Sequence, residues 1–187
     1  MKILAFAATS SKHSINKQLV GYATRILEDQ PDVDVTVETI DLVDYEMPIY
    51  SIDRQNEGGI PQAAHDFFDK IAQADAVLIS FAEHNGFYTA AYKNIFDWAS
   101  RIDMRVYQDK PTVMLSTSVG PGGGANALRT AVGSAQFFGN DVVASLSIPS
   151  FHEHFDTTTQ TLANPGLDSE FRAALATVTK NRETVSV

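Results

Sequence analysis

The polar segment Glu83-His84-Asn85-Gly86 carries the densest set of chemically useful groups in the chain. It offers a carboxylate, an imidazole, a carboxamide and a glycine that lets backbone approach a ligand closely. It directly follows the apolar run from Asp75 to Ala82, which has the pattern of a buried strand. Open α/β sheets bind ligands at such strand ends, so these groups suit the edge of a flat heterocycle. A plain exposed turn at Asn85-Gly86 is the alternative.

The loop from Ala8 to Asn16 has the composition of a phosphate cradle. Helix amino termini carry unpaired N–H groups and a partial positive charge, which stabilise a dianionic phosphate. Hydroxyl groups and the ammonium of Lys12 would complete the cradle. A simple helix cap at Ser14 is the alternative, and the residues alone favour neither interpretation. The loop lacks the Gly-x-x-x-x-Gly-Lys spacing of a P-loop. Its candidate ligands are Ser10, Lys12, Ser14, Ile15 and Asn16.

A glycine-rich loop from Ser116 to Ala125 also follows an apolar run and precedes a helical pattern. It formally matches the dinucleotide pattern Gly-x-Gly-x-x-Ala, but Pro121 removes one phosphate-binding N–H. We therefore interpret it as a loop whose backbone approaches a flat ring, with a simple flexible connection as the alternative. Its candidate ligands are Ser116, Thr117, Ser118, Gly120 and Gly123.

Two further segments invite a functional interpretation. His152, His154 and Asp156 would share a face of an extended chain, but without a further ligand a lid or interface loop is favoured over a metal site. We therefore predict no metal. The long loop from Asp41 to Gly59 is unusual in length, and we expect it to border the ligand crevice or to meet a second subunit.

Alternating strand and helix patterns position these loops, in five successive βα units. The expected strands are Ile3–Ala8, Val33–Val37, Ala76–Phe81, Thr112–Ser116 and Val142–Ile148. The first expected helix has the apolar stripe Ile15, Leu19, Ala23 and Ile26, and the others span about Gln62–Ala72, Ala90–Ile102, Ala125–Phe138 and Ser169–Lys180.

The strand patterns also predict the order of the sheet. The first, third and fourth strands are continuously apolar, as expected when helices cover both faces, whereas the second and fifth alternate, as edge strands do. The prediction is an α/β, flavodoxin-like doubly wound five-stranded parallel sheet, order 2-1-3-4-5, with helices on both faces. Residues 1–187 are expected to form a single domain. The switch point then lies between the first and third strands, at the loops of Thr9 and Glu83.

Composition excludes several classes of protein. The 187 residues are 44% apolar and 20% charged, which is typical of a globular protein. A net charge of −9 argues against nucleic acid as a partner. The absence of cysteine excludes disulfides, thiol nucleophiles and cysteine-ligated metals. The first apolar run is too short for a signal peptide and no stretch suffices for a membrane span, so we expect a cytoplasmic protein.

Four motifs of the chain are similar to those of a known family. The chain resembles the NAD(P)H-dependent FMN reductase family of flavodoxin-like quinone, azo-dye and chromate reductases, over nearly its whole length. The family's Ser–basic–Ser-x-Asn loop is similar to Ser10, Lys12, Ser14 and Asn16, and its Pro-Glu-Tyr-Asn-Gly elbow to Ala82 through Gly86. Its Leu-Lys-Asn-x-x-Asp-Trp-x-Ser-Arg helix matches Tyr92 to Arg101, and its Ser-Thr-Ser-x-Gly loop matches Ser116 to Gly124.

The chain departs from this pattern at three places. The first loop is one residue shorter, and Lys12 replaces an arginine, which gives up bidentate phosphate geometry. Ala82 replaces proline, and His84 replaces an aromatic residue that packs at the ring. These departures imply either a weaker flavin affinity or a changed acceptor preference.

The resemblance implies an FMN-dependent oxidoreductase. It would take hydride from NADPH or NADH and reduce a quinone, free flavin or similar small-molecule acceptor by a ping-pong mechanism. The flavin carries the chemistry, so no side chain is expected to be catalytic. The resemblance also implies a homodimer or homotetramer. The rivals are a flavodoxin-type FMN-binding electron carrier without turnover, and an interaction module whose flavin site has decayed.

Overall fold

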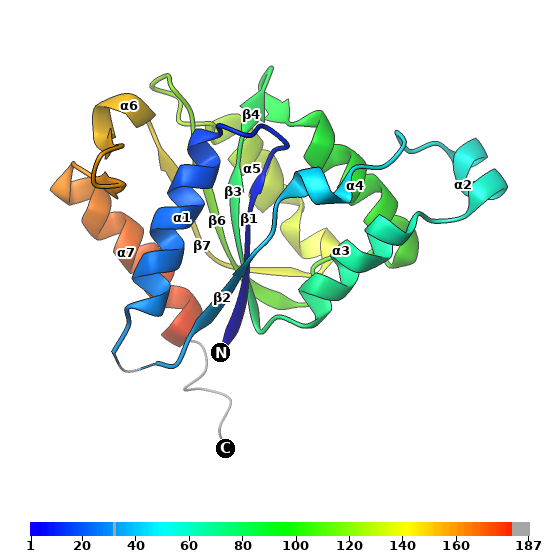
Figure 1. The fold of residues 1–187 in the computed structure, drawn as a ribbon, viewed down its shortest axis with the longest axis horizontal. Helices are drawn as coiled ribbons and strands as arrows, with labels where there is room; N and C mark the ends of the chain where they lie inside the picture. The colour runs from blue at the N-terminus through cyan, green and yellow to red at the C-terminus, as the bar shows by residue number, and fades with distance from the viewer. Residues whose placement is uncertain (32, 181–187) are drawn as a thin grey trace.

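A five-stranded parallel sheet, in the order β2-β1-β3-β6-β7, organises the molecule. The computed structural model describes residues 1–31 and 33–180 (Figure 1), so residues 32 and 181–187 of the expected domain lie outside the described part. The order is the flavodoxin-like one predicted from the strand patterns, and the fold class is confirmed. The strands span Lys2–Ala8 (β1), Thr36–Thr39 (β2), Ala76–Phe81 (β3), Lys110–Thr117 (β6) and Asn140–Ile148 (β7).

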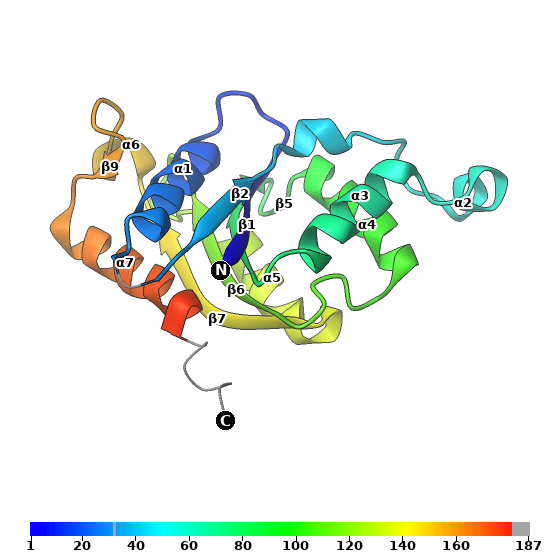
Figure 2. The same cartoon turned by 60° about the horizontal axis from the view of Figure 1, so that its bottom comes forward.

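Helices cover both faces of this sheet (Figures 1 and 2). Helices α1 (Ile15–Glu28) and α7 (Pro165–Lys180) pack on one face, and α3 (Gln62–Ala72), α4 (Ala90–Ile102) and α5 (Ala125–Ser134) on the other. Successive side chains of a strand point to opposite faces, so β1 supplies both cores. Ile3 and Ala5 pack in the core of α1, whereas Leu4 and Phe6 pack in the core of α3 and α4.

The second strand begins later than its alternating pattern predicted. It spans Thr36 to Thr39 rather than Val33 to Val37, because its ladder with β1 begins where Lys2 pairs with Thr36. Further back, the amino-terminal group of Met1 bonds to this segment, at the Asp34 carbonyl. The last helix begins earlier than predicted, at Pro165. Proline is favoured in the first helical turn, and the Asn164 side chain accepts hydrogen bonds from the next two N–H groups, of Gly166 and Leu167.

Several short elements were not predicted, because tertiary contacts rather than periodicity form them. The expected helix from Ala125 to Phe138 ends as α5 at Ser134 and continues as a 3-10 turn. The short elements are η1 (Leu42–Tyr45), α2 (Ile52–Gly58), β4 (Glu83–His84), β5 (Phe87–Tyr88), η2 (Ala135–Phe138), α6 (Phe151–His154), β8 (Phe155–Asp156) and β9 (Thr161–Leu162).

Helix α2 stands apart from the rest of the molecule, at the right of Figure 1. None of its residues is buried, and Ile49 and Ile52, just before it and at its start, are 74% and 56% exposed. Within residues 1–31 and 33–180, no helix has the length and apolarity needed to cross a bilayer.

Candidate functional site

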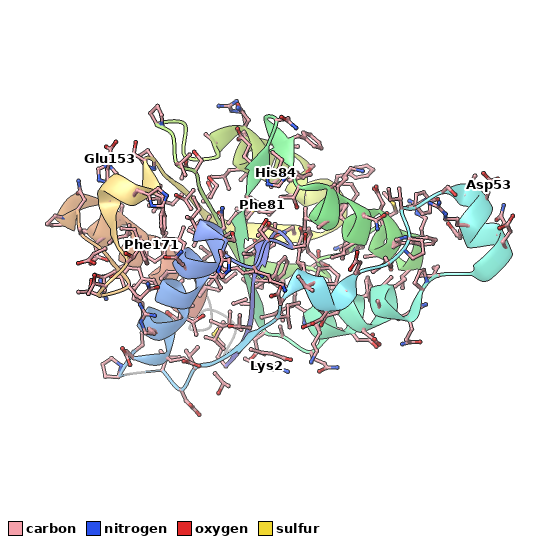
Figure 3. The ribbon with its side chains drawn as sticks, turned by 45° about the horizontal axis from the view of Figure 1, so that its top comes forward. Lys2, Asp53, Phe81, His84, Glu153 and Phe171 are labelled. Carbon is pink, nitrogen blue, oxygen red and sulfur yellow. The ribbon has the colours of Figure 1, made fainter. Side chains whose placement is uncertain are left out.

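The three loops singled out in the sequence all emerge at the carboxyl edge of the sheet. The first loop leaves β1, the elbow Glu83–Gly86 leaves β3 and the glycine-rich loop leaves β6, and these strands are neighbours. Figure 3 shows this edge at the top of the molecule, with His84 above Phe81, and Lys2 at the opposite end of the sheet. The three loops therefore lie at the same edge of the sheet, at the ends of neighbouring strands.

The first loop presents an exposed cation in front of a capped helix. Ser14 is the N-cap of α1, because its Oγ accepts a hydrogen bond from the Asn16 N–H at 3.1 Å. Residues Ser10 to His13 are exposed, and Lys12 forms no ion pair or hydrogen bond with any described residue. Ile15, the first helical residue, is half-buried. The capping interpretation of Ser14 is thus confirmed, and a free ammonium remains beside the helix terminus.

Asn16 ties the three loop-bearing strands together instead of facing a ligand. It is 2% exposed, and its Nδ2 donates to the Thr117 carbonyl oxygen at 3.2 Å. Its Oδ1 accepts from the Thr117 N–H at 3.2 Å and from the Ser80 hydroxyl at 2.8 Å. Three of the four hydrogen bonds that this carboxamide can make are thus used within the protein, and they fix the first loop against β3 and β6.

The elbow is a tight hairpin, in which His84 pairs with Phe87 and Glu83 with Tyr88. Asn85 and Gly86 sit between the strands with φ of 53° and 77°, the left-handed pair that a two-residue hairpin turn requires. His84, Asn85 and Gly86 are exposed, and the His84 side chain makes no hydrogen bond within the described part of the chain. Their backbone and side chains remain available to a ligand.

The Glu83 carboxylate bonds within the protein, although its position after β3 had suggested a contact with a ligand. Its Oε2 accepts hydrogen bonds from the N–H groups of Asn126 at 2.8 Å and Ala127 at 3.0 Å, at the start of α5. Gly124, the residue at the cap position, has no side chain to satisfy these amides. The carboxylate complements the positive end of the helix dipole and joins the elbow to the glycine-rich loop.

The hydroxyls of the glycine-rich loop also bond within the protein. Ser116 and Thr117 are buried, and they donate to the carbonyl oxygens of Gly123 and Ile148, both at 2.8 Å. The hydroxyl of Ser118 donates to the Gly120 carbonyl at 3.2 Å. Ser118 and Gly120 are only half-buried, so the accessible part of this loop is the stretch that they bound.

Gly123 has a position that no other residue could occupy without a shift. Its φ is +60°, and a Cβ there would lie 2.3 Å from the Ser147 Oγ and 3.0 Å from the Ile148 carbonyl oxygen. The glycine thus lets the loop pass close to the end of β7. Its close contact is with protein rather than with open space.

The long loop after β2 borders the first loop, as one of the two alternatives predicted. A pocket of ≈ 430 Å³ lies between Ser10 and Lys12 on one side and the segment from Leu42 to Ile49 on the other. Asn94 holds this segment by donating to the Met47 carbonyl at 3.0 Å, and the buried Trp98 donates to the Pro48 carbonyl at 2.7 Å. Asn94 and Trp98 of α4 thus have a structural role.

The His152–Asp156 segment forms no extended ladder of ligands. His152 and His154 lie on α6 and Asp156 on β8, where its Oδ1 accepts from the Thr158 N–H at 2.7 Å. In residues 1–31 and 33–180, no group of three or more histidine, aspartate or glutamate side chains is placed to hold a metal ion.

Two organising residues were missed from the sequence. Ser80 is fully buried and holds Asn16; its signal is a lone hydroxyl within the otherwise apolar run of β3. Thr89 caps α4 and donates to the Ala8 carbonyl at 2.9 Å, which joins the elbow to the first loop. A threonine directly before a helical pattern is the signal for this cap.

Fold and site together define a flavodoxin-like α/β protein with three polar loops at the carboxyl ends of β1, β3 and β6. A family model described as NADPH-dependent FMN reductase matches residues 1–153. The chain belongs to this family.

Individual relatives agree with the family assignment. The chain is 33% identical over 125 residues to an NAD(P)H:quinone oxidoreductase of Solanum tuberosum, covering 66% of this chain and 62% of that protein. It is 35% identical over 80 residues to a quinone reductase of Escherichia coli, covering 43% of each. The chain thus spans less than two thirds of the length of these relatives. The solved structure of the flavoenzyme NAD(P)H:(acceptor) oxidoreductase FerB from Paracoccus denitrificans has the same fold, with a TM-score of 0.72, 21% identity and coverage of 96% and 97%.

Proposed function

We propose that this protein is an FMN-dependent oxidoreductase that takes hydride from NADPH or NADH and reduces a quinone, free flavin or similar acceptor. The observation that carries the proposal is that three loops emerge from neighbouring strands at one edge of the sheet and are joined through Asn16, Glu83 and Thr89. These bonds set the loops before any ligand binds, which limits the entropy lost on binding. Family membership and the quinone reductases among the relatives support the same activity.

The first loop has the chemistry to hold the phosphate end of FMN. The Lys12 ammonium has no partner among residues 1–31 and 33–180, and the exposed Ser10 hydroxyl lies in the same loop. Ser14 satisfies the N–H of Asn16, whereas a helix terminus leaves further N–H groups open. A dianion placed here gains both the charge of Lys12 and the positive end of α1.

The elbow and the glycine-rich loop have the chemistry to hold a flat ring. Asn85 and Gly86 offer exposed backbone in a rigid turn, and Ser118 to Gly120 offer the accessible part of the opposite loop. Glu83, Ser116, Thr117 and Gly123 act in this proposal as supports that set the two loops in place. When bound, FMN supplies the hydride transfer, so the protein binds, orients and shields, and we assign no catalytic side chain.

A reconstitution experiment tests this function. The purified protein is incubated with FMN, separated from free FMN and examined by absorbance, and NADPH and NADH oxidation is then followed with ferricyanide or a quinone. We expect flavin bands and steady-state oxidation, with parallel lines in double-reciprocal plots for a ping-pong mechanism. Flavin bands without turnover would indicate the electron carrier instead. Absence of both would overturn the proposal and leave the interaction module.

We also propose a homodimer located in the cytoplasm, with residues 1–187 forming one FMN-binding domain. The outlying α2, with no buried residue and with exposed Ile49 and Ile52 beside it, supports a partner subunit that covers this arm. Light scattering during gel filtration measures the mass directly. A mass of one chain, 20.4 kDa, would contradict the dimer, and twice the dimer mass would indicate the tetramer.

A further inference from the structure

A second pocket, separate from the cofactor crevice, lies between α4 and α5 beside the elbow hairpin. Its volume is ≈ 350 Å³, within the size range of small-molecule sites. Its walls come from α4, α5, the hairpin residues Phe87 and Tyr88, and the segment around Tyr107. None of its lining residues belongs to the first loop or to the glycine-rich loop. A ligand there would therefore occupy a site of its own.

Six of the fifteen residues that line this pocket are aromatic. The rings of Tyr88 and Tyr92 are 5.1 Å apart, and Phe96 meets Phe138 edge to face at 4.7 Å. Phe87 and Met104, at 43% and 41% exposure, give the pocket an apolar mouth. Rings in offset or edge-to-face arrangement favour a flat aromatic guest, which can add to the same pattern of contacts.

Two tyrosines that line the pocket carry a hydrogen-bond donor that the described part of the chain does not use. Tyr92 and Tyr107 are 2% and 4% exposed, and both line the pocket. Their hydroxyls hydrogen-bond to each other, and neither has another hydrogen-bond partner in the described part of the chain. Two hydroxyls carry two protons, and a mutual bond uses only one of them. One buried O–H group is thus left without an acceptor.

Both tyrosine hydroxyls keep their protons near neutral pH, so the unused donor is present throughout that range. Burial raises the pKa of both Tyr92 and Tyr107, so both hydroxyls stay protonated. A buried donor without an acceptor costs free energy, which a ligand that supplies an acceptor oxygen would recover. At the rim, Lys93 pairs with Asp97, whereas Arg101 has no carboxylate partner among the described residues. The rim therefore has a net positive charge that favours oxygen-rich or anionic groups.

We propose that this pocket is a second ligand site, specific for planar aromatic compounds that bear a carbonyl oxygen. The rings of the pocket hold the flat body of the ligand, the free O–H of the Tyr92–Tyr107 pair donates a hydrogen bond to the carbonyl oxygen, and Arg101 supplies a positive charge among the lining residues. The proposal does not depend on FMN binding.

Calorimetric titration with two matched probes tests the donor. Naphthoquinone sulfonate and naphthalene sulfonate differ in the carbonyl groups, and both are titrated without nicotinamide so that nothing is reduced. We expect the quinone to bind roughly three- to tenfold more tightly, as one neutral hydrogen bond implies. The double variant Tyr92→Phe/Tyr107→Phe keeps both rings and removes both partners together, which is nearly neutral for folding. Its preference for the quinone should disappear, and an unchanged preference would overturn the proposal.

A blocking variant tests the location. Thr130→Trp fills the pocket from α5, and Val132→Trp, at an exposed position of the same helix that does not line the pocket, is its control. Quinone binding should weaken at least tenfold in the first variant and remain in the second. Equal binding in both would place the ligand elsewhere and refute the site. Titrations before and after FMN loading separate the two proposals, because binding that FMN abolishes belongs to the crevice.

Discussion

Asn16 and Thr117, 101 residues apart in the chain, exchange two hydrogen bonds. The Asn16 side-chain Nδ2 donates to the Thr117 carbonyl oxygen, and the Thr117 main-chain N–H donates to the Asn16 Oδ1. The pairing resembles one rung of a sheet ladder, and it ties the first turn of α1 to the last residue of β6. Ser80 adds a third bond from β3. These bonds form a buried base at this edge of the sheet, and the exposed loop residues remain available to a ligand.

Replacing Asn16 should destabilise the whole carboxyl edge. Asn16→Ala leaves the Thr117 N–H and carbonyl without these partners inside a buried site, with the Ser80 hydroxyl also unpaired. We expect a loss of about 2–4 kcal/mol in the free energy of unfolding, measured by urea denaturation. Asn56→Ala, on the unburied α2, is the control and should change it by less than about 0.5 kcal/mol. Similar values for both variants would show that the network contributes little.

Glu83 should matter for α5 more than for ligand chemistry. Glu83→Ala removes the acceptor for the Asn126 and Ala127 amides, and we expect a loss of about 1–2 kcal/mol in unfolding free energy. Glu83→Gln keeps an acceptor and should lose about half as much. FMN affinity, measured by fluorescence titration, should follow the stability order. An affinity loss in Glu83→Gln as large as in Glu83→Ala would instead indicate that the charge itself contacts the ligand.

Gly123 and its neighbour Gly122 allow a direct test of how much a close backbone approach matters for stability. A Cβ at Gly123 would lie 2.3 Å from Ser147 Oγ at a φ of +60°, whereas one at Gly122 meets nothing within 4 Å. We expect Gly123→Ala to cost at least about 2 kcal/mol in thermal or urea unfolding and Gly122→Ala to be near neutral. Equal stability of the two variants would mean that the loop relaxes freely.

Lys12 should strengthen the binding of FMN through a contact with its phosphate. Lys12→Ala removes an exposed cation that pairs with no residue of the described chain, so stability should not change, while FMN should bind roughly tenfold more weakly or worse. Riboflavin, which lacks the phosphate, should bind the variant and the unmodified protein equally. Lys12→Arg restores the charge and allows bidentate contact, so it should bind FMN at least as tightly as the unmodified protein does. An equal loss for FMN and riboflavin would contradict a phosphate contact.

Glu38 should give the protein a small acid-sensitive contribution to stability. Hydrogen bonds from Lys2 and Lys70 lower the pKa of this carboxyl below its ordinary value of 4.5. Its contribution is therefore complete above that value and is lost as pH falls through the lower, folded-state pKa. In Glu38→Gln, urea midpoints should decline less between pH 5 and 3 than in the unmodified protein. Parallel declines would show that solvent screening removes the effect.

Local pattern was sufficient for the main elements and for the strand order. The helices at Gln62–Ala72 and Ala90–Ile102 have the predicted bounds, because an apolar stripe and a polar flank specify each of them without help from the rest of the chain. The hairpin Glu83–Tyr88 and α2 were not predicted, since each is too short to show a period.

The sequence by itself determined that polar loops follow buried strands, and the βα alternation then determined that these loops share one edge of the sheet. Only the tertiary structure decided which of their groups are free. Glu83 is used by α5, Asn16 by β3 and β6, and the hydroxyls of Ser116 and Thr117 by the loop and by β7. Lys12 and His84 are also polar, but their side chains have no such partners within the described residues. Periodicity is local, whereas the partner of a buried polar group comes from a segment that can be a hundred residues away.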